Sequence, residues 1–441
     1  MTALDETLDP SLRSWVEDAN VLGTDFPIQN LPFGVFRHDF EERPRVGIAI
    51  GAHVLDCLSA TRAGLFDSLS PPVRDALQSW SLNALMALGR DDARAVRRVA
   101  SRLLRADTAD GRTAVGMRDA LLVRMDGIGM CVPAEIGDYT DFYASVFHAT
   151  NVGALFRPDN PLLPNYKWVP IGYHGRASTV VSTGTPVRRP RGQRRPDEQQ
   201  PPVFGPSVAM DYELEVAAWV GGMSAPGETI PIAQANERVF GLSLLNDWSA
   251  RDIQSWEYQP LGPFLSKSFA TTVSPWVVTA DALAPFRTPA FARPEGDPAP
   301  LPYLHDAADQ ASGGYDITLE VWLRTAAMRA REAPAVRLSH GNFQSMYWTM
   351  AQLLTHHASN GCTMRAGDLL GSGTVSGAEA EARGCLLELT RRGAEPVALP
   401  EGEMRAFLQD GDEVIIRGWC ERDGATRIGF GDCRGVVLAA T

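Results

Sequence analysis

An apolar stretch that runs directly into a polar helical face is the feature that most constrains this chain. Residues 239–245 are apolar enough for a buried strand, and Asp247 follows at its end, a usual place for a site on a rigid scaffold. Asp247, Arg251, Gln254 and Tyr258 are spaced four, three and four residues apart, so at roughly 100° per residue they share one helix face. These groups favour binding of a polar ligand, although a solvated face with an ordinary ion pair gives the same pattern. The opposite side carries large apolar side chains that we expect to be buried: Trp248, Ile253 and Trp256.

A second pattern places acidic residues at alternate positions of an apolar segment. Glu213 and Glu215 point to the same face if residues 211–220 form a strand. Two like charges about 4 Å apart cost roughly 4 kcal/mol at an effective dielectric constant near 20. The pair therefore requires a proton, an arginine or a cation between its members. Asp211 is expected on the same face, nearer to solvent.

Further acids bring the number of candidate oxygen ligands to four. Asp141 and Asp247 can join the Glu213 and Glu215 pair. Carboxylates without a cysteine or an evident histidine ligand select magnesium, calcium or manganese over zinc. His148 lies near Asp141 among aromatic residues, which makes it a candidate base, although a core or capping histidine fits the same position.

Composition and missing motifs exclude several classes of protein. The chain has 441 residues, which exceeds a single typical core, so we expect two domains. Its net charge of −12 argues against a nucleic-acid or anionic-membrane partner. The six cysteines are far apart and the N-terminus has no signal-peptide core, so we expect a reduced, cytoplasmic protein. There is no H-E-x-x-H or G-x-S-x-G motif, so the sequence lacks the usual signatures of zinc hydrolases and serine hydrolases.

The organisation along the chain predicts a β-rich architecture of two parts. We expect an accessory domain at residues 1–125, with a hairpin folded at residue 51, and a catalytic domain at residues 126–441. Two Pro-rich stretches, 185–206 and 284–303, read as long loops that cover the surface or a neighbouring subunit. The periodicity predicts helices at residues 73–88, 94–105 and 343–357. Expected strands of the second domain lie at residues 208–220, 239–245, 276–279, 317–323, 386–389, 413–419 and 436–439.

Together these segments closely resemble the fumarylacetoacetase family, and the resemblance covers nearly the whole chain. The matching motifs lie at residues 31–36, 138–157, 171–177, 211–215, 246–272, 347–350, 371–377 and 427–431. The resemblance implies a mainly β (α+β) fold, with a small Src-homology-3-like N-terminal barrel and a C-terminal mixed β-sandwich roll. It also implies a homodimer that hydrolyses a carbon–carbon bond of 4-fumarylacetoacetate, a dianionic diketo acid. The products would be fumarate and acetoacetate, in the last step of tyrosine and phenylalanine breakdown.

The resemblance also implies roles for individual residues. A divalent cation, calcium or magnesium, would be held by Asp141, Glu213, Glu215 and Asp247, with Lys267 and Thr271 near a second cation position. His148 would be the general base, oriented by Glu388. The developing oxyanion would be surrounded by Arg251, Gln254 and Lys267. The substrate would contact Tyr143, Arg157, Tyr173, Gln254, Tyr258 and Thr374. Ala270 stands where the family has glycine, and a requirement for positive φ there would distort the Lys267 and Thr271 position.

Two other readings remain open. A related metal-dependent acylpyruvate hydrolase, hydratase or decarboxylase could use the same catalytic fold. A non-catalytic cation-binding or interaction protein would explain the acids, but it would not explain His148 together with Glu388.

Overall fold

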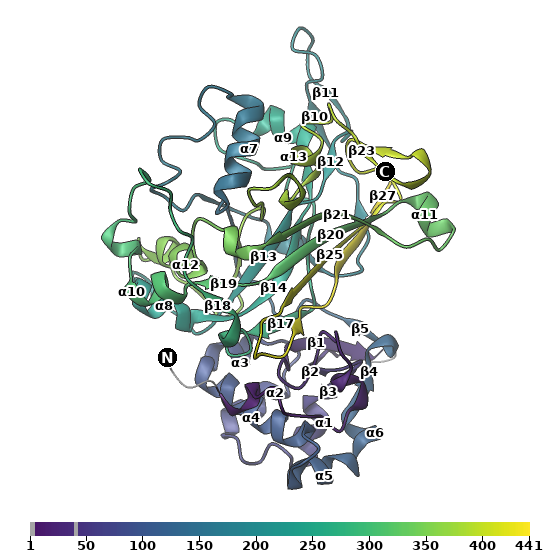
Figure 1. Cartoon of the computed structure of the whole chain (residues 1–441), viewed down its shortest axis with the longest axis vertical. Coiled ribbons are helices and arrows are strands. Elements are labelled where there is room, and N and C mark those ends of the chain that lie inside the picture. Colours follow the sequence, from purple (N-terminus) through teal and green to yellow (C-terminus); the bar gives the residue numbers. More distant parts are fainter. Residues whose placement is uncertain (1–4, 39–42) are drawn as a thin grey trace.

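One continuous sheet runs through both parts of the molecule. The structure is a computed structural model that describes residues 5–38 and 43–441. Figure 1 shows a smaller N-terminal part below a larger C-terminal part. A 13-stranded sheet joins them, because β1 (Phe33–His38) pairs antiparallel with β17 (Trp276–Thr279). The two-part, sheet-dominated fold is as expected, while the domain boundary near residue 125 stays a prediction.

The N-terminal part is a small antiparallel sheet packed against short helices. The predicted hairpin is present and turns at Gly51, whose φ of 56° suits glycine. Its other strands are β2 (Arg45–Ile50), β3 (His53–Asp56), β4 (Leu122–Arg124) and β5 (Ile128–Met130). Its helices are α1 (Cys57–Arg62), α2 (Pro71–Leu77), α3 (Asn83–Leu88), α4 (Arg90–Leu104), α5 (Ala109–Val115) and α6 (Arg118–Leu121). The helix predicted at residues 73–88 is therefore two helices, since the Leu82 N–H donates to the Pro133 carbonyl instead of to a helical partner.

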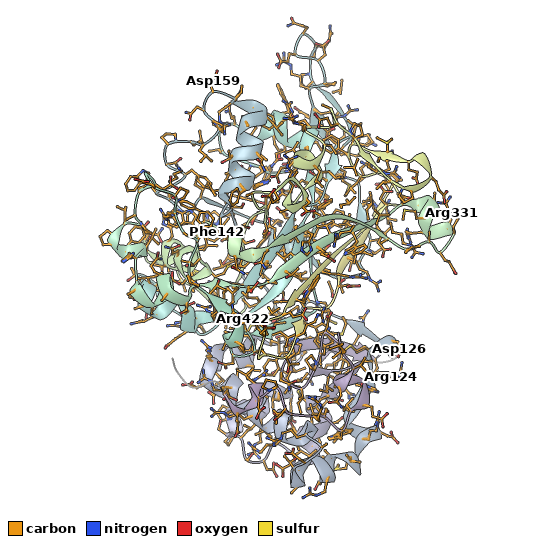
Figure 2. The ribbon with its side chains drawn as sticks, in the orientation of Figure 1. Arg124, Asp126, Phe142, Asp159, Arg331 and Arg422 are labelled. Atoms are coloured by element: carbon orange, nitrogen blue, oxygen red, sulfur yellow. The ribbon has the colours of Figure 1, made fainter. Side chains whose placement is uncertain are left out.

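The C-terminal part places two sheets around one core. Its share of the large sheet comprises β6 (Tyr139–Phe142), β7 (Gly172–His174), β8 (Val180–Ser182), β13 (Leu214–Val220), β14 (Val239–Asp247), β16 (Thr271–Val273), β17 and β22 (Leu369–Gly371). A six-stranded sheet contains β9 (Val187–Arg188), β20 (Thr318–Arg324), β21 (Val336–Asn342), β25 (Glu413–Cys420), β26 (Ile428–Gly429) and β27 (Cys433–Leu438). The two sheets approach closely at Gly418, where a Cβ would lie 2.7 Å from the Leu244 side chain. Phe142, labelled in Figure 2, lies inside this part on β6.

Short helices flank these sheets, and none among the described residues is long and apolar enough to cross a bilayer. They are α7 (Val146–Phe156), α8 (Ile232–Arg238), α9 (Arg251–Glu257), α10 (Ala307–Ser312), α11 (Ala326–Ala330), α12 (Met350–Ala358) and α13 (Leu386–Leu389). The helix predicted at residues 343–357 begins only at Met350, because Thr349 caps it. The Pro-rich stretch 185–206 is not wholly a loop, since β10 (Arg191–Arg194) and β11 (Val203–Pro206) form a hairpin whose loop projects at the top of Figure 1.

Thr349 gives the fold its simplest test. Its hydroxyl accepts from the Gln352 N–H at 3.2 Å and donates to Asp309 Oδ2 at 2.9 Å, in a buried capping box. We expect Thr349→Ala to lower the free energy of unfolding by about 1–2 kcal/mol, because both bonds are lost. Thr349→Ser keeps the hydroxyl and should cost much less in the same urea titration. Equal losses in the two variants would contradict a capping role.

Candidate active site

Four acidic side chains from neighbouring strands meet at one point. Asp141 lies on β6, Glu215 on β13 with Glu213 just before it, and Asp247 at the end of β14. One carboxylate oxygen of each lies within 4.8 Å of the others, and all four residues are buried. The pairing of β13 with β14 and β22, and of β22 with β6, produces this convergence. The structure therefore brings together the four acids that were predicted from the sequence as oxygen ligands.

Two cations of the protein neutralise one of these acids. Glu213 Oε1 accepts from Arg251 Nη1 at 2.5 Å, and Glu213 Oε2 accepts from Lys267 Nζ at 2.6 Å. Burial alone would raise the pKa of Glu213, but Lys267 and Arg251 hold that pKa well below its usual value. Lys267 Nζ also donates to Asp247 Oδ2 at 2.5 Å. Both oxygens of Glu213 are therefore already engaged within the protein.

The other side of the cluster keeps an excess of negative charge. Burial, and then the neighbouring carboxylates, raise the pKa of both Asp141 and Glu215 well above the usual range. The Gly373 N–H donates to Asp141 Oδ1 at 3.2 Å and to Glu215 Oε2 at 3.0 Å. Glu215 Oε1 is buried and has no hydrogen-bond partner among the described residues. An all-oxygen donor set with an unsatisfied carboxylate oxygen fits a hard divalent cation.

A buried imidazole–carboxylate pair forms the second group of the site. His148 Nδ1 lies 2.6 Å from Glu388 Oε2, although the two residues are 240 positions apart. The His148 N–H donates to Ser145 Oγ, which caps α7 and fixes the start of that helix. Within the described residues, the other ring nitrogen, Nε2, has no hydrogen-bond partner. The Tyr143 ring lies edge-on to the imidazole at 5.3 Å.

Glu388 is held as a carboxylate by its neighbours. Burial would raise the pKa of Glu388, but the charge and hydrogen bond of His148 lower the pKa to about 2. Asn151 Nδ2 donates to Glu388 Oε1 at 2.8 Å, and Ser376 Oγ donates to Oε2 at 2.9 Å. The Cys385 thiol also donates to Oε2, at 3.2 Å. These three supporting residues were missed from the sequence. Asn151 and Ser376 have no local spacing that links them to Glu388, whereas Cys385 lies three residues before it, a helical spacing that could have indicated the contact.

Asp211 corrects two sequence predictions at once. It is fully buried rather than near solvent, and its carboxylate accepts from the Leu386 and Leu387 N–H groups at 2.8 and 2.9 Å. These bonds cap a helical turn, α13, where a strand was predicted at residues 386–389. Asp211 Oδ2 also accepts from Arg251 Nε at 2.9 Å. One carboxylate thus fixes both the turn that carries Glu388 and the guanidinium of Arg251.

Several predicted substrate contacts reach the cluster. Arg251 Nη2 and Thr374 Oγ1 are buried without a hydrogen-bond partner in the described residues, so both can meet a ligand. Gln254 Oε1 accepts from Arg251 Nη1 at 3.2 Å. The Tyr173 hydroxyl donates to Asp247 Oδ2 at 2.9 Å. Arg251, Lys267 and Tyr173 bond to acids of the cluster directly, and Gln254 bonds to Arg251. Thr374 follows Gly373, whose N–H donates to Asp141 and Glu215.

Other sequence predictions fall outside this arrangement. Arg157 is exposed, and its Nη2 donates to the Pro161 carbonyl. Trp256, predicted to be buried, is 38% exposed, as is Tyr258 at the end of α9. The polar stripe is not one helix face, because Asp247 belongs to β14 and α9 begins at Arg251.

Ala270 does not produce the backbone distortion considered for the predicted second cation position. Ala270 has no positive φ, so it does not need to be glycine. Thr271 Oγ1 donates to Asp247 Oδ1 at 3.2 Å, next to Lys267.

Two cavities lie elsewhere. One of about 750 Å³ is in the N-terminal part beside Arg62 and Gln78, and one of about 550 Å³ lies beside Tyr139 and Gly175. Neither is lined by His148 or by the four acids. Charge and hydrogen bonding, rather than cavity volume, identify the site.

The family models and the relatives that match this chain all belong to one protein family. Residues 139–438 match the model of the fumarylacetoacetate hydrolase C-terminal domain, and residues 29–133 match that of the fumarylacetoacetase N-terminal domain. The human fumarylacetoacetase is 50% identical over 95% of this chain and 97% of its own length. The Arabidopsis thaliana fumarylacetoacetase is 47% identical over 97% of this chain and 98% of its own. A crystal structure of a Mycobacterium smegmatis protein, 18% identical, covers 92% of this chain and 99% of its own with a TM-score of 0.50. The chain therefore belongs to the fumarylacetoacetate hydrolase family.

Proposed function

We propose that this chain hydrolyses the carbon–carbon bond of 4-fumarylacetoacetate to fumarate and acetoacetate. The single observation that carries the proposal is the His148–Glu388 pair, 2.6 Å apart, next to a cluster of four buried carboxylates. Relatives named fumarylacetoacetase that match over nearly the whole chain support the same reaction. They favour it over the related acylpyruvate hydrolase, hydratase or decarboxylase.

The imidazole is arranged to act as a general base. With Nδ1 bonded to Glu388, His148 keeps Nε2 free to accept a proton from the attacking water. Glu388 holds the ring in this tautomer and stabilises the imidazolium that forms, as the acid of a catalytic triad does. The water oxygen adds to the carbonyl carbon next to the fumaryl chain. The proton on Nε2 is then available to the carbon of the departing enolate.

The cationic side chains stabilise the negative charge that develops on the attacked carbonyl oxygen. Arg251 Nη2 is buried and unpartnered, so it can donate to this oxygen without first breaking a protein hydrogen bond. One such donor is worth about 3 kcal/mol in the transition state. Lys267 and Gln254, within the same network, complete the polar surroundings. The proposed substrate contacts are Tyr143, Arg157, Tyr173, Gln254, Tyr258 and Thr374.

The acid cluster fits a divalent cation, for which we propose calcium or magnesium. Asp141, Glu215 and Asp247 would hold it. Glu213 would join them if Lys267 or Arg251 moved away and freed one of the Glu213 carboxylate oxygens. Thr271 and Lys267 would lie at the second cation position next to Asp247. When bound, such a cation supplies positive charge that stabilises acetoacetate as its enolate. Without a cation, burial and the neighbouring carboxylates raise the pKa of both Asp141 and Glu215.

A cytoplasmic homodimer is part of the same proposal. The family likeness and the scattered free cysteines support a reduced compartment, and the acidic net charge of −12 disfavours a nucleic-acid or membrane partner. Sedimentation of the purified chain would test the dimer.

His148→Ala is the first test of the mechanism. The turnover number should fall by about 10²–10⁴-fold, because general base assistance is lost. Loss of fumarylacetoacetate absorbance and release of fumarate measure turnover, while calorimetry should show unchanged cation affinity. His340→Ala is the matched control, since His340 pairs with Glu320 near the surface. Retained turnover in His148→Ala would remove His148 from the role of base.

Glu388→Gln tests the pKa of the orienting carboxylate. Because this pKa falls from 4.5 to about 2 on folding, the carboxylate contributes stability above about pH 4.5 that is lost as the pH falls towards about 2. The difference in free energy of unfolding between the unaltered chain and Glu388→Gln should therefore shrink between about pH 5 and about pH 3. Urea titrations at several pH values measure it. A difference independent of pH would contradict the ion pair.

Chelation tests the cation. Removal of divalent cations should lower turnover by at least about 10²-fold, because several kcal/mol of charge stabilisation disappears. Titration of calcium or magnesium into the chelated protein should restore both turnover and the lost thermal stability. Full turnover of protein shown to be cation-free by elemental analysis would contradict a role for the cation.

A further inference from the structure

Tyr139 carries a buried hydroxyl that the proposed mechanism does not use. The residue lies at the start of β6 and is 3% exposed. Within the described part of the chain, its hydroxyl oxygen is buried and no well-formed hydrogen bond reaches it, although the Thr271 side chain lies close by. An unsatisfied buried hydroxyl is costly, so a folded protein rarely keeps one without a reason.

Geometry places this hydroxyl at the acid cluster. Tyr139 and Asp141 are two residues apart on β6, so their side chains leave the same face of the strand. Gly371, directly opposite Asp141 on β22, leaves the space that the polar atoms share. A Cβ at Gly371 would lie 2.7 Å from Asp141 Oδ1, 3.0 Å from Glu215 Oε2 and 3.3 Å from the Tyr139 hydroxyl.

The neighbouring carboxylates decide which way the hydroxyl bonds. The charges of Asp141, Asp247 and Glu215 act on it, and carboxylate oxygens accept hydrogen bonds. The hydroxyl is therefore placed to act as a donor. Glu215 Oε1, in the same cluster, is also buried and has no hydrogen-bond partner among the described residues.

We propose that Tyr139 is a positioning residue of the cation site. Its hydroxyl donates, through one water molecule, to the free oxygen of Glu215, and so fixes the carboxylates of Glu215 and Asp141 in the orientation that receives a divalent cation. This role rests on the proposed cation site. Groups that orient metal ligands in this way commonly change metal affinity by 10–100-fold when removed, which is about the effect we expect here.

Tyr139→Phe tests the inference with a readout independent of turnover. Isothermal calorimetry with calcium and with magnesium should show affinity weaker by about 10–100-fold. Thermal unfolding of the cation-free variant should show stability close to that of the unaltered chain, because phenylalanine fills the same buried space as tyrosine. The stabilisation gained on adding cation should be smaller in the variant. Together these results would separate a ligand-orienting role from a merely structural one.

Tyr315→Phe is the matched control. Tyr315 is also buried, but it lies on β19 (Gly314–Tyr315), in a two-stranded sheet apart from the acids. Its variant should bind cations like the unaltered chain. Unchanged cation affinity in Tyr139→Phe would overturn the inference, as would failure of that variant to fold without cation. Absence of cation binding by the unaltered chain would instead overturn the proposed cation site itself.

Discussion

Uncompensated negative charge buried between strands is the constraint on which the rest of the site depends. Four carboxylates share one small volume, and only Glu213 has both oxygens bonded to protein cations. Asp141 and Glu215 are left with backbone donors and with each other. Taking such groups out of water is expensive unless they are paired, protonated or bound to a metal. The fold therefore tolerates this excess of negative charge only with a ligand or a proton.

Asp211 connects the acid cluster to the His148–Glu388 pair. Its carboxylate receives Arg251, which pairs with Glu213, and the two N–H groups that start α13, which carries Glu388. The Arg251 guanidinium and the helical turn that carries Glu388, both of which the proposed mechanism uses, are therefore held by one buried carboxylate. Such a network is rigid only while all its members are satisfied, since an unpaired buried charge is costly.

The large sheet explains why the acids can be placed so closely. β13 lies between β14 and β22, and β22 pairs with β6, so the carboxylates arise from adjacent strands of one rigid layer. The same sheet continues through β17 and β1 into the N-terminal part. That part contributes no acid to the cluster, but its strands extend the layer in which the site is held (Figure 1).

Local patterns in the sequence determined much of this protein. The alternation at Glu213 and Glu215, the apolar run before Asp247 and the hairpin at Gly51 predict elements that the structure contains, because strand periodicity and turn chemistry act over a few residues. Only the tertiary structure decided that residues 386–389 form a helical turn, since its cap, Asp211, comes from 175 positions away. The pairing of His148 with Glu388 is likewise invisible to spacing, and only family resemblance pointed to it. Hydrogen bonds between distant segments depend on how the sheets pack. The local sequence propensities of the two segments therefore cannot predict these bonds.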